Sequence, residues 1–248
     1  MTLLPLLLAA LLGGVANALA GGGMFVVFPA LLLAGVASVK ANATSSLITM
    51  PGGIAAAWVY RGTLDKQSRR EIVQLVLVSL AGSAVGSVLL LNTTNGTFSN
   101  LVPWLMLISA IVFTLAPRLR ASAEKSSGRR SAAALLTGQL VISVYGGYFG
   151  AGMGVLMIAL FLVASRMNVQ SANGIRLICG TAINVMAVSL FAWRGALDWK
   201  FGLPMLVAGS VGGYLSALVI RRLNENAVRI AILVYAWGLT AYFFARLL

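Results

Sequence analysis

Apolar residues occupy eight long stretches of the chain, separated by short polar breaks. Six stretches hold 17 to 21 residues each, the length of a helix that crosses a bilayer once: 41–60, 72–91, 101–117, 173–193, 201–220 and 227–247. The polar breaks between them are too short to fold separately, the longest being residues 118–131. The pattern therefore predicts one all-α, polytopic membrane unit that spans residues 1–248.

The two remaining apolar stretches, residues 2–36 and 132–165, are too long for a single membrane crossing. About 34 helical residues would extend roughly 50 Å, whereas a hydrocarbon core is about 30 Å thick. Glycines interrupt both stretches near the middle, at Gly21-Gly22-Gly23 and at Gly146-Gly147 with Gly150, Gly152 and Gly154. Each stretch is therefore predicted to be a glycine-broken helix or a re-entrant helical hairpin.

The two halves of the chain repeat each other. Arg61-Gly62-Thr63-Leu64-Asp65 returns as Arg194-Gly195-Ala196-Leu197-Asp198, Gly23-Met24 returns as Gly152-Met153, and Ala41-Asn42 returns as Ala172-Asn173. Equivalent halves in a membrane protein usually place a solute pathway at their interface. We therefore expect a transporter with repeat one at 1–117, a cytoplasmic basic linker at 118–131 and repeat two at 132–248.

The loop charges bear on how the halves are oriented. If both long stretches cross the membrane once, the halves are parallel, and twelve of the seventeen basic residues other than Arg176 share one side. If both fold back as hairpins, repeat two is inverted and thirteen share one side. Positive loop charge favours the cytoplasm, so the count favours inverted repeats by a small margin and leaves parallel repeats open.

Composition excludes several classes of protein. Hydrophobic residues make up 60% of the chain and mean hydropathy is +0.95, which no soluble domain requires. The net charge of +13 lies in loop clusters such as Arg69-Arg70, as expected for membrane topology rather than for nucleic-acid binding. There is no histidine, and the five acidic residues lie in or beside loops. We therefore expect no enzyme, no metal site and no cofactor.

Arg176 is the one charge placed well inside a predicted span. A buried arginine in a membrane is costly unless it faces a cavity or a partner, which makes it a candidate anion ligand. The alternative is that its side chain reaches from the end of the span toward the headgroups.

The glycine breaks are the second candidate feature. In the hairpin alternative, Gly22-Gly23-Met24 and Gly152-Met153-Gly154 would each begin a half-helix, whose exposed N–H groups and positive dipole end suit an oxyanion. Close packing of helices through small residues is the competing interpretation. We prefer that interpretation for Gly82, Gly86, Gly209 and Gly213.

Polar side chains at matching span entries complete the candidate site: Asn42, Thr44, Ser45 and Ser46 in one half, Asn173 in the other, with Thr181 and Asn184 deeper. Their amides and hydroxyls can donate to anion oxygens, or bond to their own helix instead. Pro51-Gly52 is a candidate hinge or exposed-backbone site. The pairs Arg61 with Asp65 and Arg194 with Asp198 are expected to be turn-fixing ion pairs, with a gating role as the alternative.

The order of these motifs resembles the sulfite exporter TauE/SafE family, also called the toluene-sulfonate uptake permeases. The resemblance rests on Gly21-Gly22-Gly23-Met24 leading to Pro29, then Ala41-Asn42, then Tyr60-Arg61-Gly62, with repeats at Gly150–Gly154, Ala172-Asn173 and Trp193-Arg194-Gly195. It covers nearly the whole chain. It implies a transporter of sulfite, sulfoacetate, other organosulfonates or small organic anions in a bacterial inner membrane. Repeat two departs from repeat one at Gly174-Ile175-Arg176, so the halves need not contribute equally.

We therefore expect a multi-pass transporter of small sulfur-containing anions, which binds its substrate at mid-membrane between the halves and works by alternating access. Its partners would be the anion and the lipid bilayer, with a homo-oligomer left open. A transporter of other small carboxylates is the alternative within transport. A membrane scaffold or assembly factor is the alternative from another class.

Overall fold

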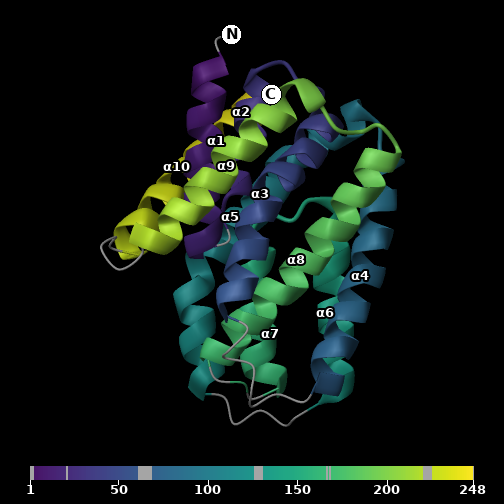
Figure 1. Ribbon diagram of the computed structural model, residues 1–248, viewed down its shortest axis with the longest axis vertical. Helices are drawn as coiled ribbons and strands as arrows, with labels where there is room; N and C mark the ends of the chain where they lie inside the picture. The colour runs from purple at the N-terminus through teal and green to yellow at the C-terminus, as the bar shows by residue number, and fades with distance from the viewer. Residues whose placement is uncertain are drawn as a thin grey trace.

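The computed structural model describes residues 3–20, 22–60, 69–125, 131–165, 167, 169–219 and 225–247. Within these ranges the chain is all-α, which confirms the predicted class, and it forms ten helices (Figure 1). They are α1 (Leu3–Ala20), α2 (Met24–Leu33), α3 (Ser38–Tyr60), α4 (Arg69–Leu91), α5 (Asn95–Lys125), α6 (Ala132–Tyr148), α7 (Met153–Ser165), α8 (Val169–Trp193), α9 (Trp199–Val219) and α10 (Glu225–Leu247).

Both long apolar stretches are broken at their glycines, giving α1 and α2 in one half and α6 and α7 in the other. Each pair folds back on itself. A Cβ on Gly13 of α1 would lie 2.4 Å from a methyl carbon of Val27 in α2, so the two helices pack side by side. In repeat two, the N–H of Ser131 donates to the carbonyl of Ala164 at 3.3 Å, which joins the start of α6 to the end of α7. Both are helical hairpins.

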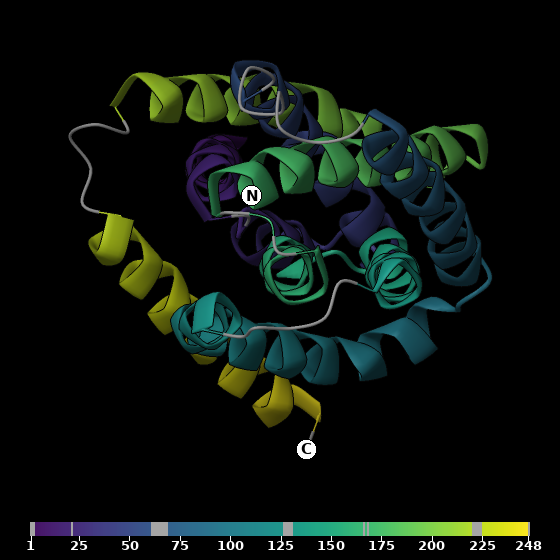
Figure 2. The same cartoon turned by 90° about the horizontal axis from the view of Figure 1, so that it is seen from below.

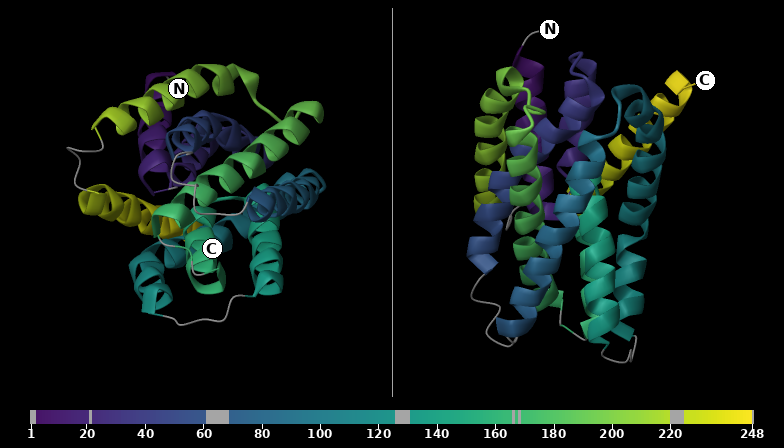
Figure 3. Two further views of the ribbon diagram at one scale, coloured as in Figure 1. Left: turned by 60° about the horizontal axis from the view of Figure 1, so that its bottom comes forward. Right: turned by 90° about the vertical axis from the view of Figure 1, so that its right-hand side faces the viewer.

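The two hairpins lie at opposite ends of the molecule. Figure 1 places α1 and α2 in its upper part and α6 and α7 in its lower part, and the side view of Figure 3 agrees. Seen from below in Figure 2, α4, α5, α9 and α10 surround α2 and α7, whose side chains are largely buried. The inverted membrane orientation of the repeats stays a prediction.

The main helix contacts of the two halves correspond when their helices are exchanged. α4 packs along α6 as α9 packs along α1, and α3 contacts α9 as α8 contacts α4, while α3 and α8 meet each other at the centre. Small residues allow the closest approaches, because a Cβ on Gly86 would lie 2.0 Å from the carbonyl oxygen of Val144 and one on Gly212 2.0 Å from that of Leu11. Gly82 and Gly209 contact α6 and α3 backbone in a similar way, which confirms the packing interpretation for Gly82, Gly86 and Gly209.

Among the described residues, three helices are long and apolar enough to cross a bilayer: Arg69–Leu91, Asn95–Leu115 and Gln170–Trp193. Five shorter apolar helices accompany them, including both members of each hairpin. Large apolar side chains such as Val73, Leu77 and Leu89 are exposed on the outer face of α4, as expected for a surface that faces lipid. The protein is a multi-pass membrane protein.

One predicted boundary differs from the structure. The span predicted at 101–117 is part of α5, which continues through Pro117 to Lys125. The first residues of the predicted linker 118–131 are therefore helical. Polar composition marks where a helix leaves the lipid, but a helix needs no apolar residues to continue beyond that point.

Candidate functional site

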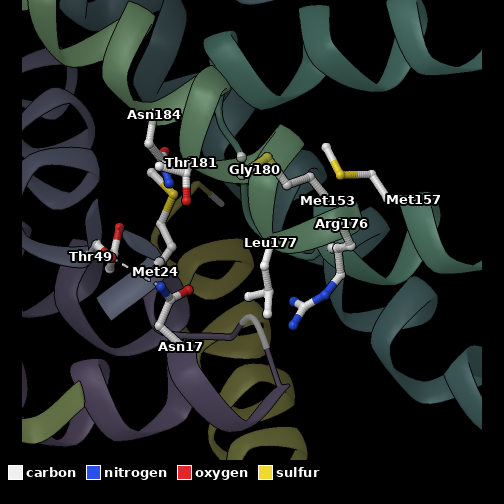
Figure 4. Close-up of a pocket in the computed structure, with 13 residues that line it drawn as sticks. Asn17, Met24, Thr49, Met153, Met157, Arg176, Leu177, Gly180, Thr181 and Asn184 are labelled. Atoms are coloured by element: carbon white, nitrogen blue, oxygen red, sulfur yellow. Dashed lines mark hydrogen bonds between the residues drawn. The ribbon is translucent and has the colours of Figure 1, made fainter. Parts of the chain in front are cut away.

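A small cavity of about 50 Å³ lies where the tips of the two hairpins meet α3 and α8 (Figure 4). The tips are close to each other, since a Cβ on Gly150 would lie 3.7 Å from the sulfur of Met24. Both halves contribute to the wall, which consists of Asn17, Met24, Thr49, Gly53, Gly150, Met153, Gly154, Met157, Arg176, Leu177, Gly180, Thr181 and Asn184.

Arg176 is the one formally charged residue of this wall. It lies in the second turn of α8, its side chain is 8% exposed, and its Nε donates to Oδ1 of Asn173 at 3.0 Å. Figure 4 shows its side chain at the edge of the cavity beside Leu177. A guanidinium held in a buried site attracts an anion strongly, because little water is present to screen its charge.

The first turn of α7 borders the same space. The chain enters α7 through Gly150 and Gly152, whose φ values of 81° and 77° belong to the left-handed region that side chains rarely adopt. The positive end of the α7 dipole thus lies at the cavity through Met153 and Gly154. A Cβ on Gly154 would lie only 2.8 Å from Nη1 of Arg176, so glycine there lets the guanidinium lie against the start of the helix. Two sources of positive potential therefore coincide.

The wall from repeat one is neutral. Asn17, in the last turn of α1, donates from Nδ2 to the carbonyl of Thr49 in α3 at 3.0 Å. The Thr49 hydroxyl donates within its own helix, to the carbonyl of Ser45 at 3.0 Å. Across the cavity, Oγ1 of Thr181 is buried and has no hydrogen-bond partner among the described residues. An enclosed hydroxyl of this kind is available to a ligand or a water molecule.

The predicted site residues fall into two groups. Met24, Met153, Gly154, Arg176, Thr181 and Asn184 come together around the cavity. The others lie outside its wall: Gly22, Gly23, Asn42, Thr44, Ser45, Ser46, Gly152 and Asn173. Gly22, Gly23 and Gly152 form the turns before α2 and α7, and Asn173 supports Arg176.

The polar residues at the start of α3 connect helices. Asn42 donates from Nδ2 to the carbonyl of Tyr148 at 2.9 Å, which ties α3 to the tip of the second hairpin. Thr44 accepts from the N–H of Asp198 at 2.9 Å. Ser45 and Ser46 donate to carbonyls one turn earlier in α3. These bonds position the helices around the cavity.

The structure describes four of the six predicted hinge and turn residues. α3 remains helical through Pro51 and Gly52, whereas Arg61 and Asp65 lie outside the described residues. The guanidinium of Arg194 lies 5.3 Å from the centre of the Trp193 ring. Oδ1 of Asp198 accepts from the N–H of Phe201 at 3.2 Å, so this carboxylate caps the start of α9.

Several cavity residues were not predicted: Asn17, Thr49, Gly53, Gly150, Met157, Leu177 and Gly180. Asn17 carried a usable signal, because it is the only amide or charged side chain in the apolar stretch 2–36, where polar residues are costly. Thr49 carried the signal of a hydroxyl in an apolar span, and Gly150 belongs to the predicted glycine break. Gly53, Met157, Leu177 and Gly180 carried none, since their contact with the cavity depends on how α3, α7 and α8 are rotated.

Known membrane transporters match this chain over nearly its whole length. The family described as "Sulfite exporter TauE/SafE" matches residues 6–243. A probable membrane transporter protein of Haemophilus influenzae is 26% identical over 230 residues, covering 91% of this chain and 88% of the relative. The probable membrane transporter protein ORF9 of a Sinorhizobium species is 28% identical, with 86% and 80% covered. The probable membrane transporter protein YfcA of Escherichia coli is 26% identical, with 96% and 89% covered.

Proposed function

The chain belongs to the sulfite exporter TauE/SafE family of membrane transporters, and on that premise we propose that it carries small sulfur-containing anions across the bacterial inner membrane. Sulfite, sulfoacetate and other organosulfonates are the proposed substrates. The observation that carries this proposal is the buried Arg176 guanidinium lying against the first turn of α7, at a cavity between the two halves.

The chemistry of the cavity suits a sulfur oxyanion. A guanidinium presents its N–H groups in a plane, so two of them can donate to two oxygens of one sulfonyl or sulfite group. The adjacent helix start adds positive potential without adding a protonatable group. The carboxylates of the described residues all lie outside the wall, so no formal negative charge there repels the anion.

The size of the cavity favours the smaller candidates. One water molecule needs roughly 10–15 Å³ of space that the centre of a water-sized sphere can occupy. The cavity offers about 50 Å³ of such space. That suits an ion of a few heavy atoms such as sulfite. A larger organosulfonate would need the hairpin tips to separate.

Alternating access is the proposed mechanism, with the halves as inverted repeats that move against each other around the cavity. Support comes from the hairpins at opposite ends of the molecule and from the main helix contacts, which correspond when the halves are exchanged. Uniport, anion exchange or coupling through the substrate's own proton fits a wall that contains no carboxylate or histidine.

Small carboxylates are the second candidate substrates, because a carboxylate also fits a guanidinium. A thermal-shift screen of the purified protein separates these possibilities, since a ligand that binds only the folded state raises the unfolding temperature. We expect sulfite or a small organosulfonate to give the largest shift, with uptake of the same radiolabelled anion by proteoliposomes. If carboxylates alone raise the unfolding temperature, small carboxylates would replace sulfur-containing anions as the substrate class. No shift and no uptake with any anion would leave the scaffold alternative.

A further inference from the structure

Asn17 brings an amide to the cavity from repeat one, whereas Arg176 comes from repeat two. It lies in the last turn of α1, within the first hairpin, whereas Arg176 lies in α8 on another side of the cavity. Its hydrogen bond to Thr49 connects it to α3. Continuing the 129-residue spacing of the repeat from Gly23 and Gly152, the matching position in repeat two is Gly146. Repeat two therefore has no equivalent amide.

The hydrogen bond to Thr49 fixes which end of the amide faces the cavity. The carbonyl oxygen of Thr49 can only accept, so the nitrogen of Asn17 must point to it, at 3.0 Å. The amide oxygen must then point away from Thr49, and in Figure 4 it lies on the side of Leu177 and Arg176. No residue in the described part of the chain donates to this oxygen. It is an acceptor turned toward the ligand space.

The cavity therefore has two unlike ends. The Arg176 guanidinium and the start of α7 attract negative charge and donate hydrogen bonds. The Asn17 oxygen can only accept, and the Thr49 hydroxyl has its hydrogen directed to Ser45. A fully deprotonated oxyanion would place its own oxygens against these acceptors, which leaves them unpaired and is costly in an enclosed site.

We propose that Asn17 selects a monoanionic sulfur oxyanion that carries its own hydrogen-bond donor, with the anionic oxygens on Arg176 and the donor on Asn17 Oδ1. Hydrogen sulfite, sulfamate and small sulfonates bearing a hydroxyl group belong to this class. The inference rests on the proposed function, since it names the form of anion that the same cavity accepts. The single positive side chain of the wall matches a single negative charge.

Sulfamate and methanesulfonate make a direct test, because both are monoanions with five heavy atoms and only sulfamate has N–H groups. Binding of each to the purified full-length protein is measured by calorimetry. We expect the wild type to bind sulfamate about tenfold more tightly than methanesulfonate, the ratio typical of one satisfied against one unpaired acceptor. In Asn17→Leu the two dissociation constants should agree within about twofold. Asn184→Leu, which removes another amide of the wall, should keep the tenfold ratio.

Each outcome has a separate meaning. Wild-type protein that binds methanesulfonate as tightly as sulfamate overturns the role of Asn17 and leaves the proposed function intact; this comparison needs no variant to fold. A ratio that survives in Asn17→Leu but is lost in Asn184→Leu also overturns it. Methanesulfonate binding that becomes equal to sulfamate binding only when sodium is added would assign the oxygen to a cation instead. If neither anion nor sulfite binds the wild type, the proposed function fails together with the inference.

Discussion

The two hairpin tips have the same scaffold and different chemistry. At the start of α7, Gly154 leaves room for the guanidinium of Arg176. At the matching start of α2 the chain has Phe25, which is fully buried, and the counterpart of Arg176 in α3 is Ser45, which bonds to its own helix. The amide of Asn17 has only Gly146 opposite it in the repeat. Duplication is thus retained where helices pack and lost where the cavity is lined.

This difference separates the two tasks of a transporter. Equivalent packing around two similar hairpins gives the halves similar ways to move, which alternating access requires. One anion needs only one positive end, and a second arginine beside the first would raise the cost of burying both when the cavity is empty. We therefore interpret the cavity as a one-sided site, in which only repeat two supplies the positive groups, although both repeats supply the surrounding helices.

The first test concerns the orientation of the two halves in the membrane. Cysteine labelling measures it, and the expected effect is all or none. Lys200→Cys at the start of α9 and Ala132→Cys at the start of α6 are exposed positions at opposite ends of the molecule. In a Cys179→Ala background, an impermeant maleimide added outside the cytoplasmic membrane should label Lys200→Cys alone. Labelling of both positions from the same side would restore parallel repeats.

The second test is of the two glycine turns, which need glycine for different reasons. Gly23 has an ordinary φ of −58°, but a Cβ there would lie 2.4 Å from the carbonyl oxygen of Gly13. The nearest atom to a Cβ on Gly152 would be 3.6 Å away, but the φ of Gly152 is 77°. We expect Gly23→Val and Gly152→Val both to abolish transport, while the variants remain expressed.

Proteoliposome uptake and a thermal melt check this pair of variants. Gly23→Val should lower the unfolding temperature more, because the obstacle is backbone that cannot move aside. Gly96→Val is the control, since Gly96 lies in the first turn of α5 with nothing within 4 Å of an added Cβ. Near-normal uptake by both turn variants would reduce these glycines to packing residues.

The third test removes the charge from one half only. Arg176→Ala should weaken anion binding by roughly 1.5–3 kcal/mol, about tenfold to a hundredfold, because a charge-assisted contact is lost. Arg176→Lys should recover part of this, since an ammonium cannot reproduce the planar two-pronged contact. Ser45→Ala, at the matching position of repeat one, should bind within about twofold of wild type because its hydroxyl bonds to Ala41.

Radiolabelled anion binding at matched folded concentrations gives these values. Equal dissociation constants for wild type, Arg176→Ala and Arg176→Lys would remove the arginine from the site. They would also favour a side chain that reaches to the headgroups.

The smallest effect tests the contact between the guanidinium and α7. Gly154→Ala places a methyl group 2.8 Å from Nη1 of Arg176 and should displace it, weakening binding by roughly threefold to tenfold as part of the contact is lost. Gly180→Ala also adds a methyl group to the cavity wall, but its nearest neighbour is Met153 Cε at 3.9 Å. Calorimetry should find Gly180→Ala unchanged, and equal losses in both variants would attribute the effect to cavity volume alone.

The fold was predictable because its signals are local. Apolar length gives the spans, glycine clusters give the two breaks, and the repeated motifs relate the halves. The extension of α5 to Lys125 was missed, because hydropathy reports the edge of the lipid and not the end of the helix.

The candidate site was predictable where a glycine break started a helix, as at Met24, Met153 and Gly154, and where a polar residue lay within an apolar span. Arg176, Thr181 and Asn184 were identified from their polarity within an apolar span, and Asn17 could have been found in the same way. Asn42 and Thr44 had the same signal but bond to Tyr148 and Asp198. Sequence does not separate these uses, because the rotation of each helix decides whether a polar group meets the cavity or a neighbour.

Locating a bound anion tests the one-sided site most directly. Selenite has the shape of sulfite and contains selenium, whose anomalous X-ray scattering marks its position in crystals of the full-length protein. A one-sided site should give one selenium peak per chain in the cavity, between the Arg176 guanidinium and the first turn of α7, with Asn17 on its far side. A peak beside Phe25 and Ser45, or two equivalent peaks related by exchange of the halves, would contradict it.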